Sequence, residues 1–139
     1  MFGNFLEQGP LRIKATGTGA DDWEVYVEPE GSWNDFADIV FVDQPVGTGV
    51  AWGDSLNTDE RQGAREIIKF LQLFMDKYPE YKSPRPFYIT GESHAGKYLP
   101  MFTKYIDDYN KKLAVPLINL QAVLLGNPIG APMIQRLRV

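Results

Sequence analysis

The sequence contains no cysteine and only one histidine among its 139 residues. Without cysteine, the chain can form no disulfide, no thiolate nucleophile and no cysteine-ligated metal site. The same absence leaves the redox state of its compartment open. These exclusions direct attention to hydroxyl and carboxylate chemistry.

Positive charge and long apolar runs are also scarce. The net charge of -4 disfavours nucleic acid or an anionic membrane as the main partner, because neither would be attracted electrostatically. Nowhere do about 18 apolar residues follow one another, as a membrane span requires. The first residues lack a basic region followed by an apolar one, so we expect no signal peptide within this sequence.

Hydrophobic periodicity predicts an α/β protein of one ordinary domain, and 44% hydrophobic residues can supply a sizeable core. The apolar run Ile39-Val40-Phe41-Val42 predicts a strand buried on both faces of a parallel sheet. A helix follows, then a strand at 87–90, a helix at 94–109 and a strand at 117–125. This order predicts right-handed crossovers and a mostly parallel sheet, with ligands beyond the carboxyl ends of its strands.

Two further patterns concern the first helix and the amino-terminal third. Asn57 or Thr58 is expected to cap the helix. Short alternations at 11–13 and 23–27 predict a hairpin. In the first helix, apolar residues at spacings of three and four are expected to face the core: Ala64, Ile67, Ile68, Leu71, Phe74 and Met75.

A glycine-rich loop, Asp43 to Gly49, leaves the first predicted strand at its carboxyl end. Its Gly47-x-Gly49 pattern invites a dinucleotide-binding interpretation. Trp52 stands where the third glycine of that motif belongs, and no helix pattern follows at once. An ordinary glycine-rich turn is therefore the favoured interpretation.

Gly91-Glu92-Ser93-His94-Ala95-Gly96 sets a serine among small residues between a predicted strand and a predicted helix. This is where a hydrolase places the serine of a nucleophile elbow, although Ala95 departs from the G-x-S-x-G pattern. A serine at this point can equally cap the helix. Sequence context alone leaves both roles for Ser93 open.

The neighbours of Ser93 also have two interpretations each. His94 is a less favoured general base, because in an elbow the residue after the nucleophile lends its backbone N–H to the oxyanion hole and the triad histidine comes later. Its ring would then pack or line a pocket. Glu92 is either a solvated carboxylate or a carboxyl group that stays protonated and binds a substrate carboxylate, more weakly as pH rises.

At these residues the chain resembles the serine carboxypeptidases, a family of the α/β-hydrolase fold whose nucleophile motif is G-E-S-Y-A-G. Residues 91–96 match that motif except at His94. Residues 3–10 are similar to the family's G-x-F-x-E-x-G-P, residues 43–49 to its D-Q-P-V-G-x-G loop, and Gly126-Asn127 to the start of its G-N-G. Glu30-Gly31-Ser32-Trp33 looks most like the peptide-processing branch.

The resemblance implies a partial α/β-hydrolase fold, a mostly parallel sheet with helices on both faces, formed by residues 1–139 as the central portion of one domain. It implies that Ser93 is the nucleophile and that the His94 N–H is an oxyanion donor. Glu92 and Glu7 would form a hydrogen-bonded carboxyl pair that binds the C-terminal carboxylate of a peptide or protein. No metal or organic cofactor is implied.

Departures from the family accompany these matches. Residues 50–52 replace its F-S-Y, and Pro128 replaces the last glycine of G-N-G. The N-G-G-P-G-C-S-S segment should precede residue 1, and the triad aspartate and histidine should follow residue 139. We therefore expect an incomplete enzyme, inactive alone. Family members are typically secreted, vacuolar, lysosomal or Golgi-resident, and no targeting signal is expected in this chain.

Two other functions fit parts of the sequence. A non-catalytic remnant with a binding or structural role would account for His94 and for the missing triad residues. Another α/β-hydrolase, such as an esterase, would share Ser93 but would gain little from two carboxyl groups suited to a free carboxylate. The oligomeric state and the residue preferred at the cleaved position stay open.

Overall fold

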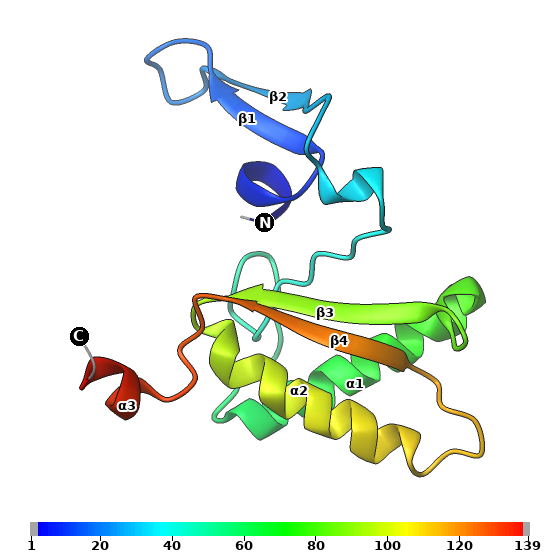
Figure 1. The fold of residues 1–139 in the computed structure, drawn as a ribbon. Helices are drawn as coiled ribbons and strands as arrows, with labels where there is room; N and C mark the ends of the chain where they lie inside the picture. The colour runs from blue at the N-terminus through cyan, green and yellow to red at the C-terminus, as the bar shows by residue number, and fades with distance from the viewer. Residues whose placement is uncertain (1–2, 138–139) are drawn as a thin grey trace. The chain divides into compact units, whose positions relative to one another are not determined.

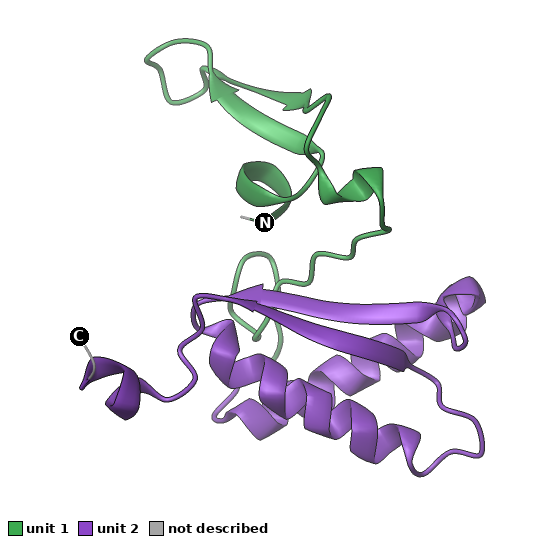
Figure 2. Ribbon diagram, viewed as in Figure 1, with its two compact units in different colours: residues 1–56 green, residues 57–139 purple. Residues whose placement is uncertain are grey.

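The computed structural model describes residues 3–137 and divides into two compact units, residues 1–56 and residues 57–139 (Figure 2). Each unit is described by itself. Among the described residues, every helix is too short or too polar to cross a bilayer.

Unit 1 is built on a two-stranded antiparallel hairpin. Strands β1 (Leu11–Ala15) and β2 (Trp23–Val27) pair from Leu11 opposite Val27 to Ala15 opposite Trp23 (Figure 1). A π-helical turn η1 (Gly3–Glu7) precedes the hairpin, and a 3₁₀ turn η2 (Trp33–Asp35) follows it. The hairpin predicted from alternating residues is confirmed.

The strand predicted at residues 39–42 is wrong. This stretch forms no ladder with any described strand, and its side chains are substantially exposed, with Val40 at 48%. An apolar run indicates burial, but a strand also needs a second strand alongside it to satisfy its backbone hydrogen bonds. The run does not find that partner within the described residues.

Unit 2 contains the parallel part of the fold. Strands β3 (Pro86–Glu92) and β4 (Asn119–Gly126) pair in parallel, and helix α2 (Ala95–Asn110) connects them. Parallel neighbours need such a crossover, because a tight turn would reverse the chain. The strand, helix and strand predicted here are confirmed, with ends shifted by one to two residues.

The remaining elements of unit 2 are α1 (Glu60–Lys77), the 3₁₀ turn η3 (Pro79–Tyr81) and the short helix α3 (Pro132–Arg136). The predicted caps of α1, Asn57 and Thr58, are wrong. Asp59 caps the helix instead, and its carboxylate accepts a hydrogen bond of 2.8 Å from the Gln62 N–H. A carboxylate can satisfy this free donor and also complements the helix dipole.

Helices α1 and α2 pack on the same face of the β3–β4 sheet (Figure 1). The predicted stripe of α1 supplies that interface: four of its residues are buried and Ile67 and Phe74 are partly buried. On the opposite face, Tyr88 and Leu124 are 56% and 47% exposed. The parallel sheet of the expected α/β fold is present. Within unit 2, helices α1 and α2 cover one of its two faces.

Candidate active site

Ser93 occupies a sharp turn between the end of β3 and the start of α2. Its φ is +56°, and Asn127 is the one other non-glycine residue between residues 3 and 137 with a positive φ. For a residue with a Cβ atom this left-handed conformation costs about 1–2 kcal/mol. A strained serine between a strand and a helix is the geometry of a nucleophile elbow.

The alternative role of Ser93, capping α2, is wrong. The cap position belongs to His94, and no side chain makes the capping hydrogen bond. Ser93 contributes its carbonyl oxygen instead, which accepts from the Gly96 N–H at 3.1 Å. Its side chain is exposed, and its hydroxyl has no hydrogen-bond partner in the described part of the chain.

The turn is held by hydrogen bonds to the last residue of β4 and to the chain just after it. The Ser93 N–H donates to the Gly126 carbonyl at 3.0 Å, and the Ile129 N–H donates to the Ser93 carbonyl at 2.8 Å. These two bonds join residues more than thirty positions apart in sequence. They account for the persistence of a strained backbone, which the surrounding structure must over-determine.

Two glycines leave space for this turn. A Cβ atom at Gly91 would lie 2.5 Å from the Ala95 Cβ, and one at Gly96 would lie 2.8 Å from the Ile129 backbone nitrogen. Neither contact is possible without displacement of the backbone. The second glycine therefore stands at position 96, where the chain after β4 passes, and alanine is accommodated at position 95.

His94 adopts ordinary helical angles, φ -62° and ψ -20°, directly after the strained serine. Its ring packs edge-on against Tyr98, one helical turn later, with 4.8 Å between the ring centroids. The His94 N–H donates no hydrogen bond to any group that the structure describes. This N–H is thus available to a ligand, while the ring is engaged in packing.

The two carboxyl groups lie in different units. Glu92 is the last residue of β3, exposed and opposite Gly126 in the parallel ladder. Glu7 is the last residue of η1 and is also exposed. Because each unit is described by itself, the pairing of Glu7 with Glu92 stays a prediction.

One contributor to the site carried only a weak signal in the sequence. Asn127 follows β4 with φ +42° and turns the chain toward Ile129, which braces Ser93. Asparagine tolerates the left-handed region better than most residues. That tolerance could have marked the turn, but its contact with Ser93 is set by tertiary structure.

The dinucleotide interpretation of Gly47-x-Gly49 does not fit the structure. A Cβ atom at Gly49 would lie 2.3 Å from the Asp43 carboxylate, which accepts a hydrogen bond of 3.0 Å from the Val50 N–H. The next helix, α1, begins only at Glu60. The glycines therefore serve a turn closed on Asp43, without the helix N-terminus that a pyrophosphate requires.

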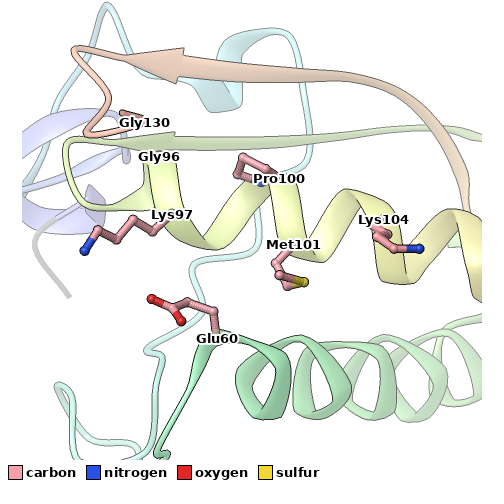
Figure 3. Close-up of a pocket in the computed structure, with 7 residues that line it drawn as sticks. All are labelled: Glu60, Gly96, Lys97, Pro100, Met101, Lys104 and Gly130. Carbon is pink, nitrogen blue, oxygen red and sulfur yellow. The ribbon is translucent and has the colours of Figure 1, made fainter. Parts of the chain in front are cut away.

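An open pocket of about 360 Å³ lies in unit 2 beside one face of α2 (Figure 3). None of the predicted site residues lines it. Residues 3–137 contain no cluster of three or more side chains suited to a metal ion. The pocket is lined by Glu60, Gly96, Lys97, Pro100, Met101, Lys104 and Gly130.

Comparison with known proteins agrees with this geometry. Residues 1–138 match the family model described as serine carboxypeptidase. The chain belongs to the serine carboxypeptidase family. The α/β-hydrolase fold expected from the motifs is confirmed by a solved structure, Kex1(Δ)p, a prohormone-processing carboxypeptidase from Saccharomyces cerevisiae. That match has a TM-score of 0.85 and 31% identity, and covers 99% of this chain and 29% of that one.

Curated serine carboxypeptidases give the same result. The pheromone-processing carboxypeptidase KEX1 of Ogataea parapolymorpha is 40% identical over 99% of this chain and 20% of the relative. Serine carboxypeptidase 24 of Arabidopsis thaliana is 36% identical over 92% of this chain and 27% of the relative. The chain thus spans less than a third of the length of these members of the family.

Proposed function

We propose that Ser93 is the nucleophile of a serine-type carboxypeptidase, to which residues 1–139 contribute the central part. The observation that carries the proposal is the Ser93 backbone, held at φ +56° between a parallel strand and a helix. An exposed hydroxyl without a hydrogen-bond partner and a free His94 N–H support it. A nucleophile and a donor for the oxyanion then occupy adjacent positions.

The proposed reaction releases one residue from the C-terminus of a peptide or protein. The Ser93 oxygen attacks the carbonyl carbon of the last peptide bond, and a base accepts the hydroxyl proton. That proton passes to the leaving amine as the C–N bond breaks. Water then hydrolyses the acyl-enzyme ester and restores the serine hydroxyl.

Glu92 and Glu7 are the proposed recognition groups for the substrate carboxylate. By the resemblance to the family, the two carboxyl groups together would bind the substrate carboxylate through hydrogen bonds. Peptides with a free C-terminus would therefore be preferred over blocked ones.

The general base is not assigned within these residues. The His94 ring packs against Tyr98, and the resemblance assigns the triad aspartate and histidine to sequence after residue 139. We therefore expect essentially no turnover from the isolated 139-residue chain. Robust peptidase activity from that chain would contradict the proposed division of the triad.

Labelling with a fluorophosphonate tests the nucleophile directly. The full-length product that contains these residues should be labelled at Ser93, and the label should be located by peptide mapping. Ser93→Ala should abolish labelling, whereas Ser55→Ala, at an exposed serine elsewhere, should retain it. Labelling at another residue would overturn the assignment, and no labelling together with no turnover would favour a non-catalytic protein.

Substrate competition distinguishes a carboxypeptidase from an esterase. A peptide with a free C-terminal carboxylate should be cleaved in preference to a neutral ester of the same acyl group. An ester preference at all pH values would revive the esterase alternative.

The cellular location is proposed on the resemblance to the family alone. We propose that the full-length protein follows the secretory route and resides in a secreted, vacuolar, lysosomal or Golgi pool. Fractionation of cells that express it with an epitope tag tests this, and a purely cytosolic pool would contradict it.

A further inference from the structure

Glu7 lies in a backbone segment that is closed by hydrogen bonds within it. The N–H groups of Gln8 and Gly9 both donate to the Gly3 carbonyl, at 2.8 Å and 3.0 Å, and so close the π-helical turn η1. Single π-helical turns are rare and occur often at functional sites. The Glu7 side chain remains exposed while its backbone is constrained.

Arg12, on strand β1, binds two carbonyls of this segment. Its Nη2 atom donates to the Glu7 carbonyl at 2.9 Å, and its Nη1 atom donates to the Gly9 carbonyl. Glu28 directly follows strand β2, and its carboxylate oxygen lies 3.8 Å from Arg12 Nε, where it supplies a counter-charge. A guanidinium group can hold two carbonyls at once because its donors have a fixed planar geometry.

Ser32 binds the same segment at the Gln8 carbonyl. Among residues 3–137 it is the only buried polar residue, 3% exposed. Its hydroxyl donates to the Gln8 carbonyl at 3.2 Å and accepts from the Asn34 N–H at 3.1 Å. The Trp33 N–H donates to the Gln8 carbonyl as well, at 2.9 Å. A buried hydroxyl with both partners satisfied links two segments 24 residues apart in sequence.

We propose that Arg12 and Ser32 are positioning residues that hold Glu7 ready to bind the substrate carboxylate. The carbonyls of Glu7, Gln8 and Gly9 are each bound by one or both of these side chains or by the adjoining backbone. None of these bonds uses the Glu7 carboxyl group. The arrangement orients the side chain through its backbone and leaves its polar end free, as preorganised recognition requires.

This inference rests on the proposed carboxypeptidase function, so its test must separate positioning from catalysis. The measurement uses the full-length product and compares kcat/KM for a free-carboxylate peptide with kcat/KM for a neutral ester of the same acyl group. Both substrates need Ser93, but only the peptide presents a carboxylate to Glu7. The ratio of the two values therefore reports carboxylate recognition.

We expect Arg12→Ala to lower this ratio about 10-fold, which corresponds to a loss of about 1.4 kcal/mol in binding free energy. Ser32→Ala should lower it about 3-fold to 10-fold, and Ser32→Thr, which keeps the hydroxyl, should restore it. Turnover of the ester should stay within about twofold of wild type. Lys14→Ala and Ser55→Ala are matched controls, because Lys14 pairs with Glu24 and neither side chain hydrogen-bonds to the Glu7–Gly9 segment.

A double-mutant cycle with Glu7→Gln separates positioning from general stability. If Arg12 acts through Glu7, adding Arg12→Ala to Glu7→Gln should not lower the ratio further. Additive losses, or equal losses for ester and peptide, would overturn the positioning role. A wild-type protein that turns over neither substrate would overturn the proposed function, and the positioning role with it.

Discussion

Replacing Ser93 by glycine is expected to stabilise the folded chain relative to Ser93→Ala, although both substitutions remove the proposed nucleophile. At φ +56° a Cβ atom crowds the backbone, at a cost of about 1–2 kcal/mol, and alanine keeps that atom. Glycine removes it but loses about 0.5–1 kcal/mol through its greater freedom in the unfolded chain. The net difference should favour Ser93→Gly by about 0.5 kcal/mol, and by as much as about 1.5 kcal/mol if the strain is at the upper end.

Urea unfolding monitored by far-ultraviolet circular dichroism can measure this difference. Ala122→Gly, at an exposed position of β4 where the backbone has no positive φ, is the matched control. It should lower the free energy of unfolding by about 0.5–1 kcal/mol, the usual cost of glycine within a strand. If Ser93→Gly were less stable than Ser93→Ala by a similar amount, the inferred strain at the elbow would be refuted.

Four further substitutions test the packing and charge of unit 2. Gly91→Ala should destabilise the chain by about 1–3 kcal/mol in urea unfolding, because of overpacking. Gly126→Ala should instead stabilise it, by up to about 1 kcal/mol, since its Cβ would meet nothing nearer than 3.6 Å and glycine is unfavourable within a strand. Met75→Ala, at a fully buried side chain, should cost about 2–5 kcal/mol, and a loss below about 1 kcal/mol would contradict its place in the core. Lys104→Ala should raise the pKa of Asp108, which the hydrogen bond from Lys104 lowers, as measured by NMR titration.

The sign of the pH effect follows from that last shift. Because the folded pKa of Asp108 is lowered, its pairing with Lys104 stabilises the folded chain above the unfolded pKa of about 3.9. That contribution is lost as pH falls through the lowered folded value. An unchanged titration of Asp108 in Lys104→Ala would show that the pair does not form in solution.

Local patterns predicted the elements of unit 2 well. The spacing of apolar residues located α1, and the strand at 87–90 and helix at 94–109 differ from β3 and α2 only at their ends. The same kind of pattern failed at 39–42, because pairing of a strand depends on a distant partner that a local window does not contain. Likewise, Asn57 and Thr58 are acceptable caps by type, but the helix begins at the carboxylate of Asp59.

By itself, the sequence determined the order of strand, helix and strand around Ser93, the small residues that the turn needs, and the resemblance to serine carboxypeptidases, since each is written in adjacent residues. Tertiary structure alone decided that the Ser93 hydroxyl does not cap α2, that Ile129 braces the turn, and that Arg12 and Ser32 hold the Glu7 segment. These contacts join residues 5 to 36 positions apart, and their hydrogen bonds depend on how the chain folds back on itself.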